Sequence, residues 1–239
     1  MYKPIILAVD TPDVSIAQKA FDFYGSSVGA IKLGLEFFYS HGPAGYASLN
    51  MGSTPTFLDL KLHDIPATVS QALHQLCLIP KKASATVPLP MMTTVHAAGG
   101  MAMLKAAVLA VKQYEDGPGI LAVTTLTSLN DGDIAEIGYR GKVIDAVKTM
   151  ADLAARAGCY GVVCSAGDAE QVRSIVGNDL KIICPGIRMP DDDVHDQKRV
   201  STPKFAIDAG ADFIVMGRSI TESNDPIKTI DTIYASLGK

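Results

Sequence analysis

The sequence predicts an α/β protein folded as a single-domain (β/α)8 TIM barrel, and three observations support this fold. Eight short runs rich in apolar and β-branched residues recur along the 239 residues. Most are apolar on both faces, as strands of a parallel sheet are, and segments with helical periodicity separate them. The first run is not followed by a GxGxxG turn, which disfavours an open dinucleotide-binding sheet.

The predicted elements alternate regularly along the chain. Strands are expected at residues 5–10 (IILAVD), 30–34 (AIKLG), 56–61 (TFLDLK), 92–96 (MTTVH), 120–126 (ILAVTTL), 160–165 (YGVVCS), 181–186 (KIICPG) and 212–217 (DFIVMG). Helices are expected at residues 14–24, 68–78, 101–114, 142–157, 169–176, 203–209 and 226–237. No linker, low-complexity tract or internal repeat divides the sequence. We therefore expect one barrel domain over residues 1–239.

The composition indicates an acidic protein without a basic face for nucleic acid. The formal net charge is −4, so local lysines and arginines must attract any anionic substrate. The N-terminal residues lack the features of a signal peptide, and no run of about eighteen apolar residues would cross a membrane. The four cysteines show no CxxC pair or metal-ligand spacing and are expected to pack in the core. These features predict a cytoplasmic protein without membrane contact.

Two loops stand out. Residues 80–90 contain three prolines and two lysines before the strand at 92–96, which places them at the barrel end opposite the active site. We expect a floppy, irregular and functionally neutral insertion there. Residues 188–200 instead follow the strand at 181–186, at the end where barrel active sites are built. Their composition predicts a mobile lid.

The stretch FLDLKLHDIP, residues 57–66, places three charged residues at the end of an apolar strand. Asp59 and Lys61 are two residues apart, so in a strand both side chains point to the same face. Asp64 follows just before Pro66, which can open the next helix. Charged side chains are rarely buried without partners, so the series indicates either a structural ion-pair cluster or a catalytic lysine held between carboxylates. The stretch alone does not distinguish these two interpretations.

In a barrel, the C-terminal ends of the strands identify the residues at the active site. These are Asp10, Lys32, Asp59, Lys61, Asp64, His96, Thr127, Ser165, Pro185 with Arg188, and Gly217 with Arg218. Two lysines and two carboxylates that converge at one mouth can keep each other ionised. A cationic Lys61 held in this way is a proton donor rather than an amine nucleophile.

The loops after the seventh and eighth strands form the usual phosphate site of such barrels. Here they read PGIR and MGRS. Gly186 and Gly217 allow backbone N–H groups to approach an anion, while Arg188 and Arg218 offer forked donors. Either arginine alone would be unremarkable on a surface, but both at these two strand ends indicate a phosphate-binding site.

The sequence resembles the orotidine 5′-monophosphate decarboxylase family, whose members form uridine 5′-monophosphate (UMP). The run DLKLHDIP is similar to the family signature, and LAVD, IKLG, TVHAAGG, VTTLTS, GVVCS, PGIR, DQKRV and VMGRSIT are further matches. The likeness covers nearly the whole chain. It implies a (β/α)8 barrel that acts as a homodimer without metal or organic cofactor.

The resemblance also implies roles for individual residues. Lys32, Asp59, Lys61 and Asp64 would form the catalytic network, in which Lys61 protonates the pyrimidine carbon as carbon dioxide leaves and Asp59 lies against the departing carboxylate. Asp64, Ile65 and Thr68 would reach into the partner subunit's site. The other substrate-binding residues implied are Asp10 and Lys32 at the ribose, Thr127 at the pyrimidine, Pro185, and Arg188, Gln197, Gly217 and Arg218 at the phosphate and its closing loop 188–200.

One feature departs from the family pattern, and two histidines have other expected roles. The interval from Asp64 to His96 is longer than usual in the family, with residues 80–90 as the surplus. Strand alternation turns His63 away from Asp59 and Lys61, so we expect it to pack or to lie at the surface. His96 ends a strand and either faces the site or is hydrogen-bonded structure.

Three functional hypotheses follow. The first is the decarboxylase. The second is a metal-dependent sugar-phosphate decarboxylase or aldolase of the same barrel superfamily, with a similar Asp, Lys, Asp spacing and a magnesium ion. The third is a catalytically silent nucleotide-binding protein, which would be expected to lack Lys61 or Asp64. Both residues are present.

Overall fold

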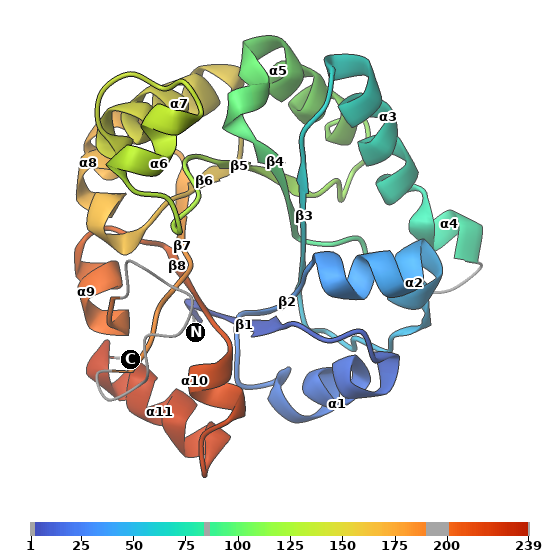
Figure 1. Cartoon of the computed structure of the whole chain (residues 1–239). Helices are drawn as coiled ribbons and strands as arrows, with labels where there is room; N and C mark the ends of the chain where they lie inside the picture. The colour runs from blue at the N-terminus through green and yellow to red at the C-terminus, as the bar shows by residue number, and fades with distance from the viewer. Residues whose placement is uncertain (1–2, 84–86, 190–200, 239) are drawn as a thin grey trace.

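The structure, a computed structural model, describes residues 3–83, 87–189 and 201–238 and shows a closed ring of parallel strands surrounded by helices (Figure 1). The strands are β1 Ile5–Val9, β2 Ala30–Leu33, β3 Thr56–Leu62, β4 Met92–His96, β5 Gly119–Val123, β6 Gly161–Val163, β7 Lys181–Cys184 and β8 Phe213–Met216. Each strand pairs with the next, and β8 pairs with β1 to close the barrel. The predicted fold is confirmed, with strand ends moved by a few residues.

The seven predicted helices are present, together with the long helix α2 and several short ones. The helices are α1 Val14–Tyr24, α2 Leu35–Ser48, α3 Pro66–Cys77, α4 Ile79–Ala83, α5 Gly100–Val111, α6 Asp131–Glu136, α7 Val143–Ala157, α8 Ala166–Val176, α9 Pro203–Asp208, α10 Arg218–Thr221 and α11 Pro226–Ser236, with a 3-10 turn at Ala97–Gly99. Helix α2 was not predicted because Gly42, at φ +59°, and Pro43 break it into two pieces. Within the described residues, no helix is long and apolar enough to cross a membrane.

The barrel has an inner and an outer apolar core. Ile6, Phe57, Met92 and Ile183 belong to the inner core, whereas residues that alternate with them along the strands pack outward against the helices. Both faces of the strands are therefore buried, which explains their nearly continuous apolar sequences. All four cysteines are free and buried, as predicted.

The end of the barrel at which β7 and β8 begin is held by a polar network around Asp212. Its carboxylate accepts hydrogen bonds from Arg173 Nη2 at 2.6 Å, Lys181 Nζ at 3.1 Å and the Ile182 N–H at 2.8 Å. Arg173 also donates to the carbonyl oxygens of Gly210 and other loop residues. This network joins helix α8 to the two last strands of the ring.

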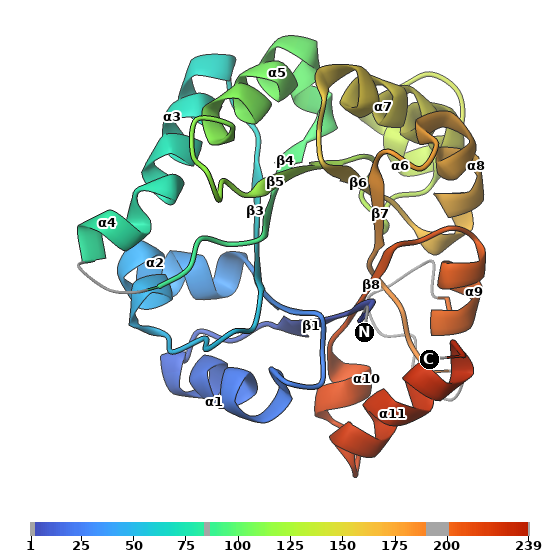
Figure 2. The same ribbon diagram turned by 180° about the vertical axis from the view of Figure 1, so that it is seen from behind.

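The predicted loop at residues 80–90 is only partly irregular. Its first residues continue helix α4, which corrects the expectation of a wholly irregular segment. Val87 is buried, and the Pro88 carbonyl accepts a hydrogen bond from the Tyr46 hydroxyl of α2 at 3.0 Å. Figure 2, which views the barrel from behind, shows the chain after residue 86 running past α2 into β4. This part of the insertion is anchored to the core rather than floppy, because its apolar side chains have a surface to cover.

Candidate active site

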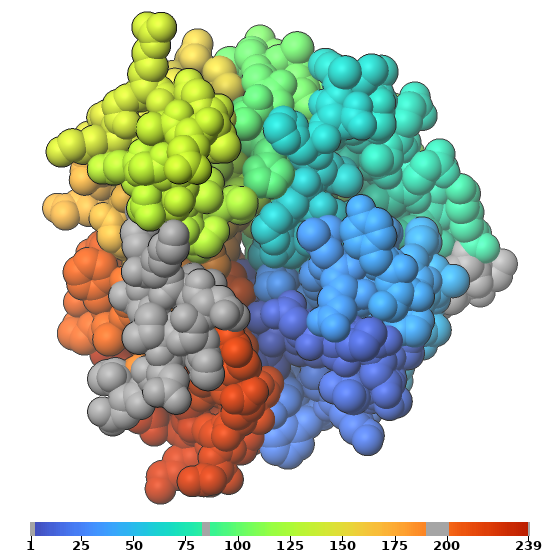
Figure 3. Space-filling model, in the orientation of Figure 1, coloured from blue at the N-terminus to red at the C-terminus, as the bar shows by residue number. Residues whose placement is uncertain are grey.

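A cavity of about 300 Å³ opens at the C-terminal ends of the strands. In Figure 3, the face seen in Figure 1 is hollowed at its centre between the yellow-green segment around α6 and the blue segment around α1. Apolar side chains of the inner core, including Phe57, Ile183 and Val215, form part of its lining. Nine of the predicted site residues also line it: Asp10, Lys32, Asp59, Lys61, Thr127, Pro185, Arg188, Gly217 and Arg218.

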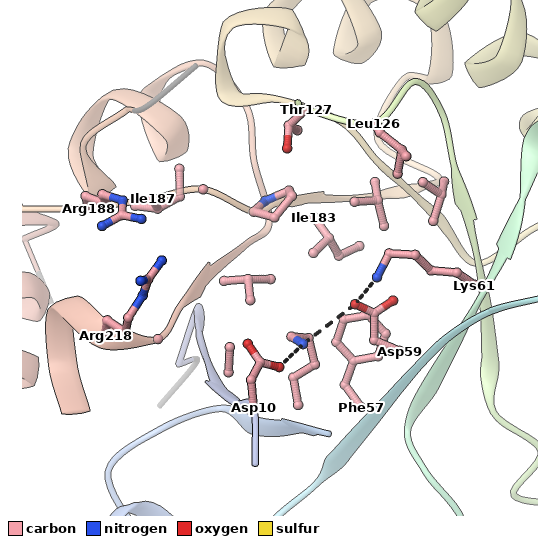
Figure 4. A pocket seen from close by; sticks show the side chains of 18 of the residues that line it. Asp10, Phe57, Asp59, Lys61, Leu126, Thr127, Ile183, Ile187, Arg188 and Arg218 are labelled. Carbon is pink, nitrogen blue, oxygen red and sulfur yellow. Dashed lines mark hydrogen bonds and ion pairs between the residues drawn. The ribbon is translucent and has the colours of Figure 1, made fainter. Parts of the chain in front are cut away.

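Four charged side chains from the first three strands form a continuous network in this cavity. Asp59 Oδ2 lies 2.7 Å from Lys61 Nζ and 3.7 Å from Lys32 Nζ. Lys32 Nζ also contacts Asp10 Oδ1 at 3.2 Å. Figure 4 shows this row of alternating charges along one side of the pocket. The lysines are thus held close together by a carboxylate that contacts both.

The surroundings of Asp59 keep its carboxylate ionised. Burial opposes ionisation, but the charges of Lys32 and Lys61 and the hydrogen bonds from Lys61 and Thr94 outweigh it, so the pKa of Asp59 lies below its ordinary value. The side chains of Lys32 and Asp59 are only 11% and 12% exposed, whereas that of Lys61 is 34% exposed. The Lys61 side chain is therefore more accessible than the Lys32 and Asp59 side chains that it lies beside, while Asp10, at 63%, is the most exposed member of the network.

Lys61 reaches the cavity through an irregularity in β3. The pairing of β3 with β4 passes from Leu58 opposite Thr93 directly to Leu62 opposite Val95, so residues 59–61 bulge opposite Thr94. Lys61 has φ +47° and is the one non-glycine residue with positive φ among those described. The two charged side chains converge as predicted, but a bulge with left-handed backbone replaces the simple strand alternation expected.

The opposite side of the pocket carries the two predicted arginines. Arg188 follows β7 and is buried, and its backbone N–H donates to the Ser201 carbonyl at 3.0 Å. Arg218 opens α10 directly after Gly217. In Figure 4 the guanidinium groups of Arg188 and Arg218 lie close to each other and away from Lys61. The pocket therefore has one end suited to an anion such as phosphate and another that holds the lysine–carboxylate network.

Six of the residues that the sequence placed at the site are not among those that line this cavity: Asp64, Ile65, Thr68, His96, Ser165 and Gln197. The buried Ser165 hydroxyl instead donates a hydrogen bond to Asp168 Oδ2 at 2.6 Å. Asp64, Ile65 and Thr68 are exposed at the start of α3, and Asp64 Oδ1 accepts a hydrogen bond from the Ile65 N–H at 2.6 Å. Gln197, with residues 190–200 of the predicted closing loop, lies outside the described residues.

His63, which lies within the signature, packs against His96 of β4. The His63 and His96 ring centroids are 5.4 Å apart. Burial, followed by the nearby charges of His63 and Lys61, lowers the pKa of His96 below its ordinary value. His63 is at the surface, as expected, and neither ring is among the residues that line the cavity. In the described part of the chain, no group of three His, Cys, Asp or Glu side chains is arranged to hold a metal ion.

Sequence reasoning missed several polar residues of the site. Thr94 touches both Asp59 and Lys61 from β4, while Thr125 and Ser219 line the cavity. The MTTVH run did contain a signal for Thr94: Met92 and Thr94 are two residues apart, so both side chains lie on the same face of the strand and Thr94 is placed beside an apolar residue. Threonine is common in strands, however, so composition alone does not mark it as functional.

Comparisons with known proteins identify the family of this chain. The profile of the family described as "Orotidine 5'-phosphate decarboxylase / HUMPS family" matches residues 3–233. The chain is 41% identical over 234 residues to orotidine 5'-phosphate decarboxylase of Ehrlichia canis, covering 98% of this chain and 97% of the relative. It is 42% identical over 234 residues to the enzyme of the same name from Wolbachia pipientis, covering 98% of each.

A solved structure supports the same relationship. The crystal structure of orotidine 5'-phosphate decarboxylase from Lactobacillus acidophilus superposes with a TM-score of 0.83 at 31% identity, covering 99% of this chain and 100% of the other. The family profile spans nearly all of the sequence, and the relatives match it from end to end. The chain therefore belongs to the orotidine 5'-phosphate decarboxylase / HUMPS family.

Proposed function

We propose that this protein decarboxylates orotidine 5'-phosphate to UMP and carbon dioxide, the last step of UMP biosynthesis, without metal or organic cofactor. The observation that carries the proposal is the Lys61 ammonium group held 2.7 Å from Asp59 in a cavity whose far side carries Arg188 and Arg218. A nucleotide monophosphate has the matching polarity, with a reacting base at one end and a dianion at the other. The names of the full-length relatives favour this activity over that of a metal-dependent sister barrel.

The proposed substrate orientation follows from the charges. The phosphate lies between Arg188 and Arg218, with Gly217 supplying backbone donors. The ribose hydroxyls meet Asp10 and Lys32, whose ion pair can rearrange to donate and accept hydrogen bonds. The pyrimidine then lies towards Lys61, with Thr127 and Pro185 beside it.

We propose that the charged network stabilises and protonates the carbanion that decarboxylation produces. When carbon dioxide leaves, the bond's electron pair stays on the pyrimidine carbon, which has no obvious electron sink. The Lys61 ammonium group stabilises this charge as it develops and then transfers its proton to the carbon. Asp59 lies against the departing carboxylate and fixes Lys61 in place. Binding energy from the remote phosphate is available to expel water from the site around Lys61.

We also propose that the active unit is a homodimer in the cytoplasm. Asp64, Ile65 and Thr68 are adjacent in sequence to the network but outside the cavity lining of their own subunit. Ile65 is a large apolar side chain that is 66% exposed, and burial against a partner would remove this surface from water. In the proposed dimer, Asp64 completes the neighbour's network.

The test is an assay of purified protein with orotidine 5'-phosphate, in which the loss of substrate absorbance is followed with and without EDTA. Turnover that is unchanged by EDTA supports the proposal. Activity on a sugar phosphate that EDTA abolishes, without turnover of orotidine 5'-phosphate, would establish the sister barrel instead. Tight UMP binding without any turnover would identify a silent nucleotide-binding protein.

A further inference from the structure

The hydroxyl of Thr94 connects the two catalytic candidates of β3 from the neighbouring strand. Thr94 Oγ1 donates a hydrogen bond to Asp59 Oδ1 at 2.8 Å. The same oxygen accepts a hydrogen bond from the Lys61 backbone N–H at 2.8 Å. A hydroxyl has a single proton, so donation to Asp59 leaves its lone pairs free to accept from Lys61. One side-chain atom therefore binds both residues at once.

The position of Thr94 explains why these contacts form. Residues 59–61 bulge opposite Thr94, so the Lys61 N–H faces the Thr94 side chain instead of a backbone carbonyl. Thr94 is fully buried and shares its strand face with Met92 of the inner core. A buried N–H without a partner is unfavourable, and Thr94 supplies that partner from inside the barrel.

The two hydrogen bonds of Thr94 also constrain both parts of Lys61 that set the position of its ammonium group, namely its backbone and its side chain. The backbone of Lys61 has φ +47°, a conformation that lysine rarely adopts and that needs support from its surroundings. Its side chain is directed by Asp59 Oδ2, and Thr94 holds the other oxygen of the same carboxylate, which limits rotation of that group. Loss of the hydroxyl would release both the lysine backbone and the carboxylate that orients its tip.

We propose that Thr94 is a positioning residue for the decarboxylation, in which its hydroxyl holds Asp59 and the bulged backbone of Lys61 in the geometry that proton transfer requires. Thr94 does not touch the substrate in this role and acts through the two residues that do. The inference rests on the proposed function. It predicts that the hydroxyl matters for turnover far more than for nucleotide binding, because the ribose and phosphate contacts come from other strands.

Thr93, the neighbour of Thr94 in β4, provides a matched control residue for the test. Thr93 is also fully buried, but its Oγ1 has no hydrogen-bond partner in the described structure, and the residue is not among those that line the cavity. It alternates with Met92 and Thr94 and therefore faces the helices. Replacing either threonine by valine keeps the side-chain shape and removes only the hydroxyl, so Thr93→Val matches Thr94→Val in chemistry and burial.

The experiment compares wild type with Thr94→Val, Thr94→Ala, Thr94→Ser and Thr93→Val, measuring kcat for orotidine 5'-phosphate and Kd for UMP. We expect kcat of Thr94→Val and Thr94→Ala to fall about 100-fold, while Kd for UMP stays within about threefold. Thr94→Ser should recover most of kcat, since it restores the hydroxyl, and Thr93→Val should match wild type.

Several results would overturn this role. They are a Thr94→Val or Thr94→Ala kcat within about threefold of wild type, a Thr94→Ser variant as slow as the valine variant, or a loss of UMP affinity as large as the loss of kcat. If Thr94→Val does not fold, the comparison of Thr94→Ala with Thr94→Ser decides the question. Failure of the wild type itself to turn over orotidine 5'-phosphate would instead refute the proposed function, and this inference with it.

Discussion

Replacement of Lys61 by alanine tests the proposed chemistry most directly. The ammonium group is held 2.7 Å from Asp59 Oδ2, and the Lys61 side chain is more exposed than those of Lys32 and Asp59. If a carbanion forms about 3 Å from this ammonium, the Coulomb stabilisation at an effective dielectric constant of about 20 is about 5 kcal/mol. That energy corresponds to a factor of about 10⁴ in rate. Loss of the proton donor adds a further factor of about 10² or more. The two factors multiply, so we expect kcat of Lys61→Ala to fall by about 10⁶.

The same substitution should leave the fold and nucleotide binding measurable. Asp59 keeps its contacts with Lys32 at 3.7 Å and with Thr94 at 2.8 Å. Because the Lys61 side chain is 34% exposed, solvent screening reduces the net contribution of its ion pair to folding to about 1–2 kcal/mol. The variant should unfold slightly earlier in denaturant and still bind UMP.

The assay measures loss of substrate absorbance together with UMP binding by calorimetry. Lys181→Ala is the matched control, because Lys181 also pairs with an aspartate, at 3.1 Å, and is 37% exposed, but it lies at the start of β7. We expect Lys181→Ala to keep the wild-type kcat. A Lys61→Ala enzyme with kcat within tenfold of wild type would refute the assigned role, because neither charge stabilisation nor proton delivery would then depend on this side chain.

Three further predictions concern the dimer, the phosphate and acid stability. Mixing inactive Lys61→Ala and Asp64→Ala proteins should restore part of the activity through hybrid dimers, and no recovery after demonstrated subunit exchange would argue against a shared site. Arg218→Ala should raise KM about 10–100-fold through loss of a charged hydrogen bond to phosphate, and an unchanged KM would exclude this contact. Burial opposes ionisation of Asp212, but its hydrogen bonds hold its pKa in the folded protein below the ordinary value of 3.8. The ionised Asp212 therefore stabilises the folded state above pH 3.8, and this stabilisation is lost as the pH falls through the pKa of the folded protein. Asp212→Asn should therefore lower the free energy of unfolding by about 2 kcal/mol near pH 7, measured by denaturant unfolding, and this difference from wild type should vanish in acid. The control Asp208→Asn, which breaks an exposed ion pair, should lower it by less than about 0.5 kcal/mol. Equal losses for the two variants would show that the Asp212 network does not stabilise the fold.

The strands could be predicted from the sequence because each is buried on both faces. Runs such as IILAV and FIVM have few alternatives once helices separate them. Helix α2 could not be predicted in the same way, since Gly42 and Pro43 interrupt its periodicity while packing against the barrel keeps both halves helical. The anchoring of Pro88 depends on the hydroxyl of Tyr46, more than forty residues earlier, and no local sequence pattern predicts such a contact.

The candidate site was predictable where chemistry concentrates at strand ends. Lys32, Asp59 and Lys61 are conspicuous because isolated charges in apolar strands need partners. The bulge that brings Lys61 into place was not predictable, because it is a mismatch between two strands rather than a property of either. Thr94 was missed for the same reason, since its role is visible only once β4 is set beside β3.

The pairing of the first strand with the last has a consequence for how the enzyme matures. Asp10 follows β1 and Arg218 follows β8, and these strands meet through Ile5 opposite Ile214 and Leu7 opposite Met216. During synthesis, the two ends of the cavity can therefore be brought together only after almost the entire chain has been made. Recovery of turnover on refolding would thus report completion of the ring itself, and a folding intermediate in which the ring is still open would lack activity even if most of its helices had formed.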